Sequence, residues 1–208
     1  MNISEIVAFL ENAYDVLNQK YFEGELPKAV ITIQSSPRAY GHFTPWDAWR
    51  ENENGYKEIN IGAETLNRDV FSVLATMVHE QVHYYCLLNN IKETSRGNGK
   101  GSPGYYHNQK FKIEAEKRGL IIEYDKKIGY SITHPSPELI EFIKEQGWQG
   151  VDLARQEQLS FSGGSNGRTK TNSWKMVCDG CGCCVRATKR TVNIACLDCG
   201  LKMEIVEK

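Results

Sequence analysis

The chain has 208 residues, 40% of them hydrophobic and 25% charged, which suits one medium-sized domain with a small appendage or two small domains. Its formal net charge is −1, and no run approaches the ~18 apolar residues that a membrane-spanning helix needs. The first residues, MNISEIVAFLENAYDVLN, carry Glu5 and Glu11 and no basic segment, which argues against a secretory signal. We therefore expect an intracellular, cytoplasmic protein with reduced cysteines and no membrane partner.

In chain order, the spacing of apolar residues predicts four helices, over residues 3–20, 68–89, 108–118 and 136–147. Short β-branched or aromatic runs predict strands over residues 29–33, 40–45, 56–61 and 120–124. Residues 92–104 are rich in Gly, Ser and charge, so we expect a loop or flap there. The mixture of helices and strands predicts an α+β fold.

Charge and cysteine are distributed unevenly along the chain. Residues 166–208 contain 8 Lys and Arg against 4 Asp and Glu, a balance of +4, whereas the rest of the chain has −5. Six of the seven cysteines lie at or beyond Cys178. Residues just before this part lose hydrophobic periodicity and end in SGGSNGRTKTNS. The sequence thus predicts three parts: a domain over 1–148, a flexible linker over 149–172 and a small domain over 173–208.

The second predicted helix contains HEQVH, in which His79 and His83 are four residues apart and Glu80 follows the first. Residues i and i+4 of an α-helix lie on one face, so both imidazoles can bind one metal ion. Glu80 is rotated by about 100° and can reach a metal-bound water without being a ligand. The pattern is typical of a zinc site with a carboxylate base, and burying two unpaired histidines instead would be costly.

A catalytic zinc ion takes three protein ligands and leaves one coordination position open. His107 is well placed as the third ligand, because it follows the Gly-rich segment and immediately precedes the third predicted helix. The alternatives with a suitable ligand atom are His42, His134, Glu114 and Glu116.

The C-terminal part reads CDGCGCCVRATKRTVNIACLDCG and predicts a zinc ribbon, a small antiparallel β domain. Its two C-x-x-C pairs are 14 residues apart and suit one closed structural site with four thiolates: Cys178, Cys181, Cys196 and Cys199. We expect residues 185–188 and 192–195 to form a hairpin. Cys183 or Cys184 could replace Cys181, and a disulfide framework is the alternative that the expected compartment disfavours. Cys86 is expected in the core.

Basic and aromatic residues accompany the predicted ribbon. Arg186, Lys189 and Arg190 lie in its expected hairpin and Trp174 precedes it, a combination that suits phosphates and stacked bases. Further basic residues nearby are Arg168, Lys170 and Lys175. The alternative is that these charges only keep a small metal-stabilised domain in solution.

The chain resembles the SprT-like family of zinc metalloproteases, which includes the Spartan-type proteases that act on DNA–protein crosslinks. The resemblance runs through most of the chain: YFEGELP at 21–27, YGHF and INI in the predicted strands, HEQVH, HNQKF with Phe111, and the cysteine ribbon. It implies a zincin-like minimal metalloprotease domain with zinc ligands His79, His83 and His107 and with Glu80 as general base. The family usually has Gly after its third histidine, where this chain has Asn108.

The resulting prediction is a zinc-dependent endopeptidase with two Zn²⁺ ions, one catalytic and one structural. Glu80 would act as general base on a zinc-bound water, and Tyr105 or Tyr106 is a candidate oxyanion partner. The resemblance implies protein substrates associated with DNA, single-stranded or damaged. Two alternatives stay open: a nucleic-acid-binding zinc-ribbon protein with an inactive HExxH domain, and a zinc hydrolase acting on a substrate other than peptide.

Overall fold

The computed structural model describes residues 1–36, 39–96, 105–126, 128–156 and 174–206. Within these ranges the chain has four α-helices and ten strands, which confirms the predicted α+β class. The chain divides into two compact units, residues 1–158 and residues 159–208. None of the helices in the described part of the chain is long and apolar enough to cross a membrane.

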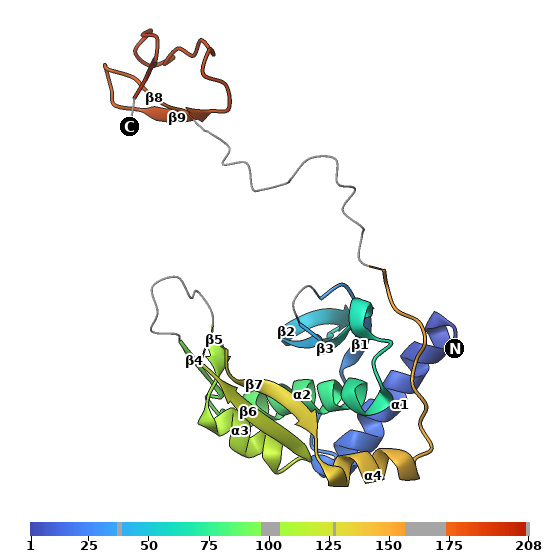
Figure 1. The fold of residues 1–208 in the computed structure, drawn as a ribbon. Coiled ribbons are helices and arrows are strands. Elements are labelled where there is room, and N and C mark those ends of the chain that lie inside the picture. The colour runs from blue at the N-terminus through green and yellow to red at the C-terminus, as the bar shows by residue number, and fades with distance from the viewer. Residues whose placement is uncertain (37–38, 97–104, 127, 157–173, 207–208) are drawn as a thin grey trace. The chain divides into compact units, whose positions relative to one another are not determined.

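Helix α2 (Val70–Leu88) is the central element of the larger unit (Figure 1). Twelve of its 19 residues are buried, because it contacts the other three α-helices and strands of two sheets. A helix that is enclosed in this way needs apolar residues around most of its circumference. The other helices are α1 (Ile3–Tyr21), α3 (Gln109–Glu116) and α4 (Pro137–Glu145).

One three-stranded sheet lies beside α2, with strand order β1-β3-β2. Its strands are β1 (Val30–Gln34), β2 (Gly41–Glu51) and β3 (Asn54–Gly62). β1 pairs with β3 in parallel and β2 pairs with β3 antiparallel, so β2 is an edge strand. The hairpin β2–β3 is longer than predicted. It closes at Asn52, whose φ of 54° is a conformation that Asn tolerates in tight turns.

A second sheet, with strand order β4-β5-β7-β6, packs against α2 through β6 and β7 (Figure 1). Its strands are β4 (Thr94–Arg96), β5 (Tyr105–His107), β6 (Leu120–Asp125) and β7 (Gly129–Pro135). Of these the sequence predicts only β6. Strand β4 lies inside the expected loop 92–104 and β5 directly follows it; the two strands pair with each other, and β5 also pairs with β7. Residues 97–104 lie outside the described residues.

Residues 149–156 belong to the predicted linker, yet they pack against the larger unit. Val151 is 4% exposed and joins the hydrophobic core. The backbone N–H of Arg155 donates to the carbonyl oxygen of Ala63 at 2.9 Å. The first part of the predicted linker therefore belongs to the larger unit. Residues 157–172, the rest of the predicted linker, lie outside the described part of the chain.

The smaller unit contains an antiparallel sheet with strand order β10-β8-β9. Its strands are β8 (Trp174–Val177), β9 (Cys184–Ala187) and β10 (Glu204–Ile205). The predicted hairpin of residues 185–188 with 192–195 is wrong, since β9 pairs with β8 instead. The turn between them causes this, because the backbone N–H of Cys178 donates to Cys183 and that of Gly182 donates back to Cys178.

Candidate metal centres

Three histidines converge next to the middle of α2. His79 and His83 lie one turn apart on this helix, and His107 is the last residue of β5. The candidate ligand nitrogens of the three rings all lie within 4.8 Å of one another. Nε2 of His107 is 3.1 Å from Nε2 of His83. The second sheet therefore brings the third histidine, 24 residues further along the chain, against the face of α2 that carries the other two.

Each of these rings has an oxygen partner at its second nitrogen, Nδ1. The pairs are His79 with Thr133 Oγ1 at 2.9 Å, His83 with Glu93 Oε2 at 2.6 Å, and His107 with Ser131 Oγ at 2.8 Å. An ionised carboxylate only accepts, and the Ser131 hydroxyl donates to the carbonyl of Ile128, so His83 and His107 donate from Nδ1. The lone pairs on Nε2 are then left for a metal ion, as in metal sites with ordered ligands.

Phe111 packs against all three rings from α3. Its ring is fully buried, stacks on His107 with centroids 4.1 Å apart, and lies 4.9 Å from His83 and 4.7 Å from His79. Asn108, which directly follows His107, caps α3 by accepting from the backbone N–H of Lys110. The segment HNQKF thus supplies the third histidine, the start of the helix and the apolar packing beneath the rings.

The protonation of the histidines follows from their surroundings. Burial lowers the pKa of His79 well below its usual range, and it lowers the pKa of His107 to about 3, so both rings stay neutral. Burial acts in the same direction at His83, but the hydrogen bond with Glu93 and the negative charges of Glu80 and Glu93 together outweigh it, and the pKa is raised. Neutral imidazoles are the form that binds metal ions.

Glu80 lies beside the histidines and is buried, with 5% of its surface exposed. Burial raises the pKa of Glu80 to about 7, against the opposite effects of His83 and of a hydrogen bond from the Phe43 backbone. Strand β2 passes close to this carboxylate because residue 41 is glycine. A Cβ atom on Gly41 would lie 3.2 Å from Glu80 Oε1 and 2.9 Å from the Thr76 methyl group.

The alternative third ligands lie elsewhere. Each has a charged partner outside the cluster: Glu58 for His42 at 3.8 Å, Glu123 for His134 at 3.9 Å, Arg118 for Glu114 at 2.7 Å and Lys112 for Glu116 at 3.6 Å. Of the five candidates for this position, His107 alone joins the described histidine cluster. Tyr105 and Tyr106 lie in β5 beside it, and their suggested role at the oxyanion stays a prediction.

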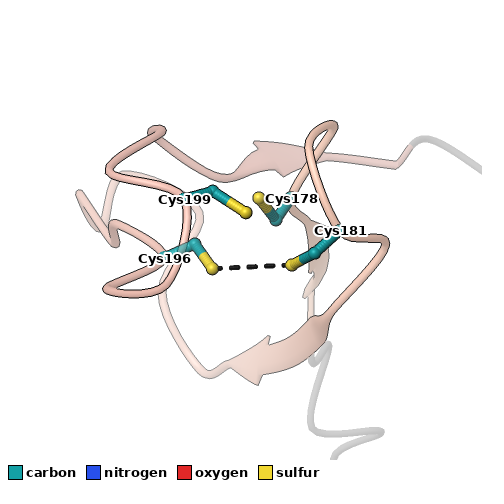
Figure 2. A group of neighbouring side chains, drawn as sticks. All are labelled: Cys178, Cys181, Cys196 and Cys199. Atoms are coloured by element: carbon teal, nitrogen blue, oxygen red, sulfur yellow. Dashed lines mark hydrogen bonds between the residues drawn. The ribbon is translucent and has the colours of Figure 1, made fainter.

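Four cysteines converge in the smaller unit, and their sulfur atoms point toward a common centre (Figure 2). They are Cys178, Cys181, Cys196 and Cys199, and all four Sγ atoms lie within 4.8 Å of one another. Backbone hydrogen bonds from Cys181 and Gly180 lower the pKa of Cys178 to about 7, which favours the thiolate that metals bind.

None of the seven cysteines forms a disulfide bond, and three of them lie outside the cluster. Cys181 Sγ and Cys196 Sγ are 3.6 Å apart, and all seven cysteines of the chain are free, which contradicts a disulfide framework. Cys183 and Cys184 are exposed, whereas Cys86 is fully buried in the larger unit, as expected. Burial raises the pKa of the Cys86 thiol to about 12.

The basic and aromatic residues of the smaller unit divide between the two faces of its sheet. The guanidinium of Arg190 lies 4.9 Å from the centre of the Trp174 ring. Lys175 pairs directly with Arg186 across β8 and β9, on the opposite face from Trp174 because side chains alternate along a strand. Lys189 is exposed after β9. Arg168 and Lys170 lie outside the described residues.

The fold and these two clusters define an α+β protein with a three-histidine and a four-cysteine candidate metal centre. A curated protein that is similar is an uncharacterized protein from the mucB 3′ region of Salmonella typhimurium, 40% identical over 47 residues. The match covers 23% of this chain, and the chain spans only 62% of the length of that relative. No protein-family model and no solved structure matches the chain.

Proposed function

We propose that the protein is a zinc-dependent endopeptidase with a zincin-like, SprT-type catalytic unit. The observation that carries this proposal is the convergence of three histidine nitrogens beside the buried carboxyl of Glu80. Three imidazoles whose Nδ1 atoms are already hydrogen-bonded fit a zinc ion that keeps one coordination position open. When bound there, the ion would polarise a peptide carbonyl and make water a better nucleophile.

Glu80 is proposed to transfer the proton. Its carboxylate accepts a proton from the attacking water and then gives it to the amine that leaves. A carboxyl whose burial raises the pKa to about 7 can do both near neutral pH. The backbone of Phe43 and the close approach of Gly41 hold this carboxyl against β2.

A polypeptide substrate is favoured by the position of β2. This strand is at the edge of its sheet and passes Glu80, so its outer backbone groups can pair with an extended peptide. Such pairing would bring a peptide bond to the carboxyl whatever the side chains of the substrate are. A small non-peptide substrate would make no use of this edge.

The smaller unit is proposed to hold a structural zinc ion and to contact DNA. Lys175 and Arg186 lie directly opposite each other in the sheet, and two neighbouring cations suit the phosphates of DNA. Trp174, with Arg190 against its ring, offers an aromatic group for stacking on the other face. Substrates associated with DNA would then be held near the peptidase.

The test compares wild type with Glu80→Gln, using Glu145→Gln on the exposed surface of α4 as the charge-matched control. Zinc content is measured first, and cleavage of an unfolded protein is then measured with and without single-stranded DNA. We expect two zinc ions per chain in all three proteins and a loss of about 100-fold to 10,000-fold in cleavage for Glu80→Gln alone.

Two results would contradict the proposal. A Glu80→Gln variant as active as wild type would exclude the carboxyl as the proton acceptor. A wild-type protein that holds two zinc ions and binds single-stranded DNA but cleaves no protein would favour the nucleic-acid-binding alternative.

A further inference from the structure

The segment that follows α2 folds back along the helix toward His83. Asn90 adopts a φ of 54°, and the backbone N–H of Ile91 donates to the carbonyl of Cys86 at 2.8 Å. This reversal places Glu93 level with His83, ten residues earlier in the chain. The side chains of Glu93 and His83 are 19% and 14% exposed, so their contact is largely shielded from water.

Glu93 contacts both parts of the histidine cluster. Its carboxylate accepts from Nδ1 of His83 at 2.6 Å, and its backbone carbonyl accepts from the N–H of Asn108 at 2.8 Å. The next residue, Thr94, pairs with His107 in the β4–β5 ladder. One residue therefore connects the second histidine of α2 with the strand end that carries the third.

Asn108 completes this connection from the other side. Its amide nitrogen Nδ2 donates to the carbonyl of Lys92 at 2.9 Å and lies 3.3 Å from Ser95 Oγ. Its Oδ1 accepts from Lys110 at the start of α3. A glycine here, as in most members of the family that this chain resembles, could make none of these side-chain contacts.

We propose that Glu93 and Asn108 are positioning residues that hold His83 and His107 in register for one metal ion. The inference rests on the metal site of the proposed function but not on the peptidase activity. Glu93 is the one charged partner among the three groups at Nδ1, since the others are the hydroxyls of Thr133 and Ser131. A carboxylate at Nδ1 orients the ring and makes Nε2 a stronger donor to the metal.

The experiment measures zinc affinity at the histidine centre by competition with a chelator, and the absorption spectrum after cobalt replaces zinc. Glu93→Gln keeps the size and an oxygen acceptor but removes the charge. We expect its zinc affinity to fall about 10-fold to 100-fold and its cobalt spectrum to shift, while the four-cysteine centre keeps its metal. Glu145→Gln, a change of the same charge on exposed α4, should behave as wild type.

Asn108→Asp tests the second positioning residue separately. Aspartate keeps the acceptor that caps α3 but loses both donors to residues 92 and 95, and Asn and Asp cap helices about equally well. We expect a lower zinc affinity than wild type. The melting temperature of the metal-free variant is measured as well, so that any stability lost with the two hydrogen bonds is separated from the loss of affinity.

The outcomes separate this inference from the proposed function. Zinc affinities and cobalt spectra equal to wild type in both Glu93→Gln and Asn108→Asp would overturn the positioning role. If wild type and His79→Ala hold the same number of zinc ions, the histidine centre itself is wrong and both proposals fail. If wild type cleaves no protein but Glu93→Gln still weakens zinc binding, the endopeptidase is wrong and the positioning role stands.

Discussion

Gly41 lets the backbone pass close to Glu80, and Gly129 lets it pass close to the histidine cluster. A Cβ atom on Gly129 would lie 2.5 Å from the carbonyl oxygen of His107 and 2.7 Å from the Tyr106 ring. Gly129 also has a φ of 68°, in the left-handed region that favours glycine. Any side chain at this residue must therefore push β5, and with it His107, away from β7.

Gly129→Ala is expected to weaken zinc binding at the histidine centre as well as stability. Gly147→Ala is its matched control, because Gly147 has a φ of 67° but no neighbouring atom within 4 Å of the added Cβ. Left-handed backbone costs a non-glycine residue about 1–2 kcal/mol, so Gly147→Ala should lose roughly that much stability in urea unfolding, and Gly129→Ala should lose more because its Cβ also meets the His107 carbonyl. Only Gly129→Ala should lower the zinc affinity measured by chelator competition. Equal affinities in the two variants would contradict the steric argument.

At the scale of elements, the stability of α2 depends on the residue that caps its N-terminus. The side chain of Asp69 accepts from the backbone N–H of Ser72 at 2.9 Å and from its hydroxyl at 2.6 Å. Partial burial raises the pKa of Asp69, but these hydrogen bonds outweigh it and the net effect lowers the pKa. The start of the helix that carries HEQVH is thus secured by one ionised side chain.

Asp69→Ala should lower the free energy of unfolding by about 1 kcal/mol, measured with urea at pH 7. Because the folded-state pKa is depressed, this contribution is present above the unfolded pKa of about 3.9 and is lost as pH falls through the folded value. Asp69→Asn keeps the cap without titrating, so its stability should fall less steeply in acid than that of wild type. Parallel acid dependence of the two proteins would show that Asp69 contributes nothing through its charge.

At the scale of the whole molecule, the two units differ in what stabilises them. The larger unit has an extensive core around α2, whereas the core of the smaller unit consists of Met176, Ala187, Met203 and two of its own candidate ligands, Cys178 and Cys196. A domain with so little apolar surface needs a metal or another cross-link to fold. The two candidate metal centres should therefore respond differently to metal removal.

Cys196→Ser, or a chelator strong enough to strip both centres, is expected to unfold the smaller unit and leave the larger unit folded. Amide hydrogen exchange measures this directly: protection over residues 174–206 should disappear, while residues 70–88 remain protected. Zinc content should fall from two ions to one in Cys196→Ser. Retained protection in the smaller unit without metal would show that its core suffices.

Much of this architecture can be predicted from local patterns in the sequence. Apolar spacing predicts α2 to within two residues at each end, because a helix repeats every 3.6 residues whatever surrounds it. The spacing of HEQVH puts two imidazoles on one face for the same reason, and the C-x-x-C pairs need only a tight turn each. By contrast, β4, β5 and β7 have no strong sequence signal, since short strands are stable only through their partners.

The sequence by itself determined the helices, the α+β class and which side chains are able to bind metal, because those properties are set by residue type and near-neighbour spacing. Only the tertiary structure decided that His107 meets His79 and His83, and that Glu93, Ser131 and Thr133 orient the three rings. These residues are ordinary polar side chains in the sequence. They become partners of the histidines because strand pairing and the reversal after α2 bring distant segments together, and no local periodicity records such contacts.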